Sequence, residues 1–158
     1  TSIGPTAFRG CTSLTSITIP DGVTSIENTT FEECTHLASI RIPDSVTSIG
    51  HAAFRKCTSL TSITIPDGVT SIGQNVFQSC SSLTIVTIGD SVTSIGNRAF
   101  SYCKNLTEVT FLGDAPKEGK EVFEEATPTI YRKPEAKGWG DTWGGRSVKL
   151  ISEKPNNP

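Results

Sequence analysis

The sequence predicts an α/β repeat solenoid, in which coils of about 23 residues stack edge to edge. The first observation behind this prediction is a strict internal period, because cysteine, leucine and phenylalanine each recur at steps of 23 residues. The three columns are Cys11, Cys34, Cys57, Cys80 and Cys103; Leu14, Leu37, Leu60, Leu83 and Leu106; and Phe8, Phe31, Phe54, Phe77, Phe100 and Phe123. The second observation is that one unit holds only about eight apolar positions, too few to enclose a core of its own. Each coil must therefore be covered by its neighbours.

Each unit opens with a short predicted strand and a turn. Leu14, Ile17 and Ile19 form a run rich in β-branched residues, whose apolar side chains are expected to point inward. Pro20 ends the run, and the Pro-Asp-Gly sequence over residues 20–22 is a turn signal. Stacked strands of this kind lie about 4.8 Å apart, so equivalent side chains should lie over one another in columns.

The rest of the unit is predicted as a second extended segment and a helical turn. Val23 and Ile26 mark the second short extended segment. Val76, Phe77 and Cys80 in a later unit lie three and four residues apart, which places them on one face of a single helical turn. The predicted coil thus combines short parallel strands with one helical turn.

Composition limits the function classes. The net charge is −2 and 19% of residues are charged, which argues against nucleic-acid binding, because that needs clustered Lys and Arg. No apolar run reaches the length of about 18 residues that a membrane span needs, so no membrane insertion is expected from this segment. Two histidines and no methionine leave little material for metal or acid–base chemistry. We therefore expect no enzyme activity, no catalytic residues, no cofactor and no bound metal.

The repeat also resembles a known family. Residues 1–111 follow the pattern L-x-x-I-x-I-P-x-x-V-x-x-I-G-x-x-A-F-x-x-C, which is similar to the BspA-like (Treponema-type) leucine-rich repeat. The resemblance implies a right-handed leucine-rich-repeat superhelix, built mostly of short parallel strands and single helical turns. It also implies a bacterial cell-surface or secreted protein with a role in adhesion, and a host surface or extracellular-matrix protein as partner. The family motif carries no catalytic residues.

Three positions depart from the repeat pattern, and one of them, Thr30 in place of alanine, exchanges one small residue for another. Glu27 stands where the other units have a glycine such as Gly96, so either a positive φ is not required at this position or the unit is strained. Gly89 replaces the turn proline that the other units have, for example Pro66. None of these departures changes the predicted fold.

The chain divides into repeats and a C-terminal region. The repeats are expected to span residues 1–113, and a capping region residues 114–158. Residues 1–4 align with the second extended segment of a unit, which predicts a repeat array that is truncated at its N-terminus and starts within a repeat. Residues 152–158 are rich in Pro and Asn and are expected to be a flexible tail.

The outward side chains of the first strand in each unit form the candidate protein-binding surface. They alternate with the inward side chains, so stacking should gather them into one rigid, mostly neutral face. The members are Ser16, Thr18, Ser39, Arg41, Ser62, Thr64, Ile85, Thr87, Glu108 and Thr110. Arg41, Ile85 and Glu108 interrupt a field of Ser and Thr and are the better candidates for recognition. The alternative is a solvated surface that reflects strand propensity alone.

Two further columns have both a functional and a structural interpretation. The inward position of the cysteines favours buried, inert thiols, although stacked neighbours also lie within reach of a disulfide. The acidic column at the turn consists of Asp21, Asp44, Asp67 and Asp90. One carboxylate per turn is fewer than calcium needs, so we expect these side chains to bond to the backbone of their own turn.

Two alternatives to protein recognition remain open. Trp139 and Trp143 lie in a Gly-rich segment of the capping region and could stack on a glycan, although covering the apolar end of the last coil is the expected role. The array could instead be a purely structural segment that spaces or displays another part of a longer protein.

Overall fold

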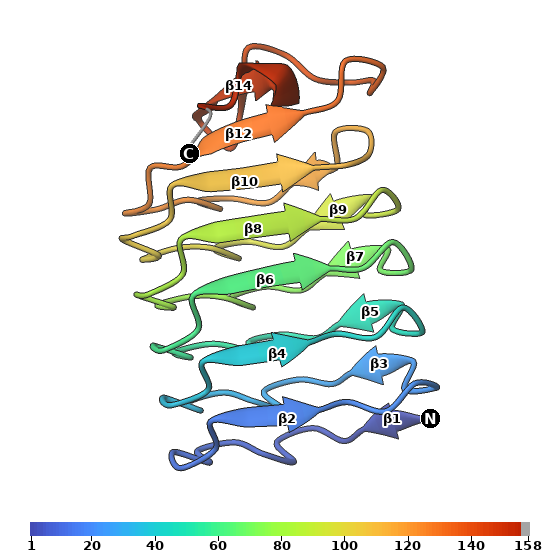
Figure 1. Ribbon diagram of the computed structural model, residues 1–158, viewed down its shortest axis with the longest axis vertical. Coiled ribbons are helices and arrows are strands. Elements are labelled where there is room, and N and C mark those ends of the chain that lie inside the picture. Colours follow the sequence, from blue (N-terminus) through green and yellow to red (C-terminus); the bar gives the residue numbers. More distant parts are fainter. Residues whose placement is uncertain (156–158) are drawn as a thin grey trace.

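Short strands follow one another up two sides of a stack of coils (Figure 1). The computed structural model describes residues 1–155. The longer strands form one side and are β2 (Ser16–Thr18), β4 (Ser39–Arg41), β6 (Ser62–Ile65), β8 (Ile85–Ile88), β10 (Glu108–Phe111), β12 (Thr129–Arg132) and β14 (Arg146–Leu150). The shorter strands form the other side and are β1 (Ser2–Ile3), β3 (Ser25–Ile26), β5 (Ser48–Ile49), β7 (Ser71–Ile72), β9 (Ser94–Ile95) and β11 (Lys117–Glu118). At the C-terminal end, β13 (Thr142–Trp143) pairs antiparallel with β14.

Consecutive coils are parallel and lie in register, one repeat apart. Ser48 pairs with Ser71 on the shorter strands, and Val86 pairs with Val109 on the longer ones. The step shortens toward the C-terminus, where Val109 pairs with Ile130 and Ile130 pairs with Val148. The predicted solenoid of parallel coils is confirmed, because repeat-equivalent side chains lie over one another.

The phenylalanine column forms the centre of the core. Its six rings stack from Phe8 to Phe123, with neighbouring ring centroids 5.3–5.7 Å apart and interplanar angles of 5–20°. The four rings in the middle of the column, Phe31, Phe54, Phe77 and Phe100, are fully buried. The column is the feature that the 23-residue period requires, and the structure contains it.

The predicted helical turns are wrong, and with them the α/β class. The N–H groups of Asn75, Phe77 and Ser79 donate to carbonyls of the next coil at 2.8–3.0 Å. Asn75 and Ser79 have φ of 59° and 61°, in the left-handed region that a right-handed α-helix excludes. An isolated helical turn gains few hydrogen bonds, whereas the adjacent coil offers a carbonyl to every second residue. Within residues 1–155 the one helix is the 3₁₀ turn η1 (Ile151–Glu153), and none is long and apolar enough to cross a membrane.

The cysteine column is buried beside the phenylalanine column. All five cysteines lie in the described part of the chain and are free. The thiol of Cys57 donates to the carbonyl oxygen of Phe31 at 3.2 Å, and that of Cys80 to Phe54 at 3.1 Å. Burial raises the pKa of the Cys57 thiol to about 12. The thiols of Cys34, Cys57, Cys80 and Cys103 are therefore hydrogen-bonded core groups with little thiolate at neutral pH, as expected.

Alkylation should separate Cys11 from the four buried thiols. Cys11 is half-buried at the open end of the column, whereas burial raises the pKa of Cys34 to about 11 and that of Cys103 to about 12. We expect iodoacetamide to modify only Cys11 in the native protein at mildly alkaline pH, because the reactive thiolate is depleted roughly tenfold per pKa unit. A second, isotopically distinct reagent is added after denaturation. Peptide mass spectrometry then measures, for each cysteine, the ratio of native to denatured labelling. Equal native labelling of Cys57 and Cys11 would contradict the structure.

The same thiols make stability depend on alkaline pH. The pKa of Cys57 is about 12 in the folded protein against 9.0 for an unperturbed thiol. Between these values the unfolded state holds fewer protons than the folded state, so the free energy of unfolding falls as pH rises. The contribution of the buried thiols is complete below pH 9 and is lost toward about pH 12.

Candidate functional site

The structure brings the ten predicted surface residues together on one face, called the strand face below. Pairing of the longer strands arranges them in two columns. The first column contains Ser16, Ser39, Ser62, Ile85 and Glu108, and the second contains Thr18, Arg41, Thr64, Thr87 and Thr110. Both columns run along the stack, so the strand face crosses five coils (Figure 1).

Exposure of the strand face changes along the stack. The residues on β2, β4 and β6 are exposed, and so is Ile85 on β8, with 43% of its surface accessible. Thr87 and Glu108 are half-buried, and Thr110 is buried, with 4% of its surface accessible. The N-terminal and central parts of the face are therefore open, whereas its C-terminal end is covered.

The cover comes from the C-terminal segment, residues 151–154. After β14 the chain turns through η1, and the Lys154 ammonium lies 3.4 Å from Glu108 Oε1 and 2.5 Å from Thr110 Oγ1. The structure differs here from the flexible tail expected from residue 152 onward. Residues 152–154 are described, with the Lys154 side chain against the strand face, and residues 156–158 lie outside the described part of the chain.

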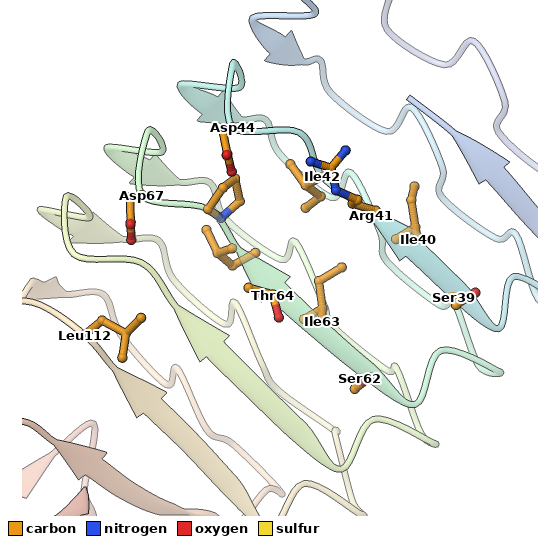
Figure 2. Close-up of a pocket in the computed structure, with 12 residues that line it drawn as sticks. Ser39, Ile40, Arg41, Ile42, Asp44, Ser62, Ile63, Thr64, Asp67 and Leu112 are labelled. Carbon is orange, nitrogen blue, oxygen red and sulfur yellow. The ribbon is translucent and has the colours of Figure 1, made fainter. Parts of the chain in front are cut away.

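A crevice opens in the strand face between β4 and β6 (Figure 2). The strands β6, β8, β10, β12 and β14 form one hydrogen-bonded ladder, and β2 and β4 form another, but no bridge joins β4 to β6 within the described residues. The gap encloses about 450 Å³. Ile40 is half-buried on its wall, whereas the equivalent Ile63 and Val86 are buried. The crevice therefore gives this part of the face an apolar floor that a partner could contact.

The main-chain hydrogen bonds differ on the two sides of β6. Thr84 N–H donates to Thr61 O at 2.9 Å, but the equivalent bond from Thr61 to Ala38 is absent among the described residues. At the other end of the strand, Pro66 has no N–H to donate. Gly89, at the same position in the next coil, donates to Ile65 O at 2.8 Å and closes the ladder. Pro66 alone does not open the ladder, because β2 and β4 pair although Pro43, at the same repeat position, also lacks an N–H.

Arg41 lies at the edge of this crevice and is free to bind. Its guanidinium is 3.8 Å from the Asp21 carboxylate, and the two side chains are 72% and 86% exposed. Ion pairs at such exposure contribute about 0–1 kcal/mol, so a partner could displace Asp21 at little cost. Figure 2 shows the side chain between Ile40 on β4 and Ile42, which directly follows β4.

One member of the acidic column, Asp67, links two coils. Asp67 Oδ1 accepts a hydrogen bond from the N–H of Asp90, one coil further on, at 3.1 Å. The expected bond to the backbone of its own turn is replaced by this bond between coils, because stacking brings the next turn within reach. Among the described residues no group of three His, Cys, Asp or Glu side chains could hold a metal ion.

Both tryptophans pack at the C-terminal end of the core. The centroids of the Trp139 and Trp143 rings lie 4.9 Å and 5.1 Å from that of Phe111. Their indole N–H groups donate to the carbonyl oxygens of Gly113 and Pro116. Trp143 is buried and Trp139 is half-buried, so the geometry favours the covering role over a glycan platform.

One buried carboxylate was not singled out by the sequence analysis. Glu32 is 3% exposed and lies between two arginines, 2.9 Å from Arg9 Nε and 3.2 Å from Arg55 Nη1. The three residues belong to successive coils at the same repeat position, so a search for columns of alternating charge would have found them. Their role is to join three coils, because removal of one partner would leave a buried charge uncompensated.

These features define the class of protein. Parallel coils of about 23 residues, with a ladder of short strands on one side, form a leucine-rich-repeat solenoid. The chain belongs to the family described as BspA type leucine rich repeat region, whose model matches residues 1–129 in six copies. No curated protein matches the chain at a significant level.

Two solved structures are similar to this chain. A leucine-rich-repeat protein of Treponema pallidum is 33% identical, with a TM-score of 0.62, and the match covers 78% of this chain and 69% of that one. A leucine-rich cell surface protein of Faecalibacterium prausnitzii is 30% identical, with a TM-score of 0.56, and the match covers 78% of this chain and 43% of that one. Both neighbours are bacterial, and the second is much longer than the matched region.

Proposed function

We propose that this chain is a non-enzymatic protein-recognition module of a cell-surface or secreted adhesion-type protein, and that its strand face binds the partner. The observation that carries the proposal is Ile85, which is 43% exposed on a Ser- and Thr-rich face and pairs with Ser62 on the wall of the crevice. An exposed aliphatic side chain next to an apolar crevice and a free guanidinium supplies the elements of a small binding centre.

The rigidity of the strand face supports this proposal. Its residues lie on strands that hydrogen-bond to adjacent coils, so their backbone loses little conformational entropy when a partner binds. Many weak contacts can then add to a useful affinity. The surface location rests on the family and on the Faecalibacterium prausnitzii protein, which is described as a cell surface protein. Residues 114–158 complete the module as its cap, and a host surface or extracellular-matrix protein is the proposed kind of partner.

Substitution of Ile85 or Arg41 should weaken partner binding while the fold is retained. We expect Ile85→Asp and Arg41→Ala each to weaken binding about tenfold, which corresponds to roughly 1.4 kcal/mol. The measurement is surface plasmon resonance against a panel of immobilised extracellular-matrix proteins, with circular dichroism to verify folding. Tyr102→Asp and Lys120→Ala are matched controls, because both side chains are exposed and neither belongs to the strand face.

The outcomes separate recognition from display. If a matrix protein binds equally to wild type, Ile85→Asp and Arg41→Ala, the strand face is not the site. If no member of the panel binds the chain at all, the structural alternative gains support, in which the solenoid displays another part of a longer protein.

A further inference from the structure

The C-terminal end of the strand face differs chemically from the rest. Around the Lys154 ammonium lie the Glu108 carboxylate at 3.4 Å, the Thr110 hydroxyl at 2.5 Å and the ring of Tyr131, whose centroid is 5.1 Å away. Glu108 and Thr110 are on β10, and Tyr131 pairs with Thr110 from β12. A carboxylate, a hydroxyl acceptor and an aromatic face are the groups that bind an ammonium ion well.

The occupant of this site is held only lightly. No residue of η1 is buried, and the Lys154 side chain remains 28% exposed. The bond from Leu150 N–H to the Glu153 carboxylate closes the turn on itself and does not tie it to the repeats. A segment with few buried contacts opens at low free-energy cost, whereas β10 and β12 beneath it belong to the hydrogen-bonded stack.

We propose that Glu108, Thr110 and Tyr131 form a lysine-binding subsite of the strand face, occupied in the free protein by Lys154. A lysine on an extended segment of a protein partner takes this place when residues 151–154 are displaced. The inference rests on the proposed function and extends it, because it assigns a basic side chain to the partner. It also makes the C-terminal segment a built-in competitor for one end of the face.

Charge and shape favour lysine as the occupant. Glu108 is 25% exposed in the pair and has no second cationic partner among the described residues, so the subsite has one negative charge to satisfy. The Lys154 ammonium also lies over the Tyr131 ring, which an uncharged side chain of equal length would gain less from contacting. The position of Lys154 thus indicates that the subsite fits a primary ammonium group.

Occupation of the subsite by Lys154 should lower the affinity of the free protein for an external lysine. A tethered ligand acts at an effective concentration of about millimolar, so a lysine in solution must compete with Lys154 for the site. Removal of the Lys154 side chain should therefore raise the affinity for an external lysine, in proportion to the fraction of sites that Lys154 occupies.

The experiment is a heteronuclear NMR titration of the full chain with Nα-acetyl-lysine amide. We expect Lys154→Ala to show saturable shifts of the amides of Glu108, Thr110 and Tyr131, with at least tenfold higher affinity than wild type. The uncharged probe Nα-acetyl-norleucine amide should bind Lys154→Ala at least tenfold more weakly, and so should the lysine probe to the double variant Lys154→Ala/Glu108→Gln. Lys120→Ala, which removes an exposed lysine outside the longer strands, should behave as wild type.

Three results would overturn the proposal. They are a well-dispersed Lys154→Ala spectrum without saturable shifts, equal affinity for the lysine and norleucine probes, and equal affinity of wild type and Lys154→Ala for lysine. The titration does not involve Arg41 or Ile85. If it fails while substitutions at those two residues still weaken partner binding, the strand face stands as the recognition surface and only the lysine subsite is wrong.

Discussion

Phe77→Ala is expected to destabilise the solenoid by about 3–5 kcal/mol. The Phe77 ring is fully buried and is stacked on both faces, with centroids 5.5 Å from Phe54 and 5.3 Å from Phe100. The cavity left by alanine cannot close, because hydrogen bonds from Phe54 to Val76 and from Phe77 to Ala99 fix the distance between the coils. Urea denaturation followed by circular dichroism measures the loss as a lower midpoint.

Phe8→Ala is the matched control in the same column. Phe8 is half-buried, and its ring has one stacked neighbour, Phe31, at 5.4 Å. Because the end of the stack can relax into solvent, the substitution should cost less than half as much as Phe77→Ala. Equal midpoints for the two variants would show that the phenylalanine column is not the main source of cohesion between coils.

The fold could be predicted because burial imposes the period. A column such as that of the phenylalanines has an apolar side chain in each unit, and only stacking in register covers all of them at once. The helical turn at residues 75–80 could not be predicted correctly. The same side chains face inward whether the backbone forms a helix or a stacked turn, and the hydrogen bonds that decide, such as Phe77 to Ala99, reach the next coil.

The arrangement of the candidate site could be predicted where it depends on strand alternation and not where it depends on contacts between distant residues. The two columns of the strand face follow from the strand pattern, and the structure contains both. The cover over Thr110 comes from Lys154, 44 residues further along the chain, and no local pattern marks such a pair. The crevice could not be predicted from the turn prolines, because Pro43 and Pro66 both lack an N–H, yet β4 pairs with β2 and, within the described residues, not with β6.

Gly96→Ala is expected to destabilise the stack by about 3 kcal/mol, at the upper end of what an overpacked site costs. A Cβ on Gly96 would lie 2.5 Å from Gln74 N and 2.6 Å from Gly73 C, both main-chain atoms of the preceding coil. These atoms cannot move aside as a side-chain tip would, so the coils must separate. The separation would weaken the hydrogen bond from Gly96 N–H to Ile72 O, which is 2.8 Å long.

The same comparison explains why glycine stands at position 96. Gly96 has no positive φ, so the need is for close approach of two main chains and not for left-handed backbone. Glu27, at the same repeat position one coil after Gly4, carries a side chain and likewise has no positive φ. Gly4 occupies the same repeat position, but no atom lies within 4 Å of its Cβ site, because no coil precedes it in the described stack. Gly4→Ala should therefore be neutral or stabilise by up to about 1 kcal/mol, since alanine restricts the unfolded chain. Thermal unfolding of both variants checks this difference in the sign of the stability change. If Gly4→Ala destabilised the protein as much as Gly96→Ala, the backbone preference of glycine, and not the spacing of the coils, would account for the residue.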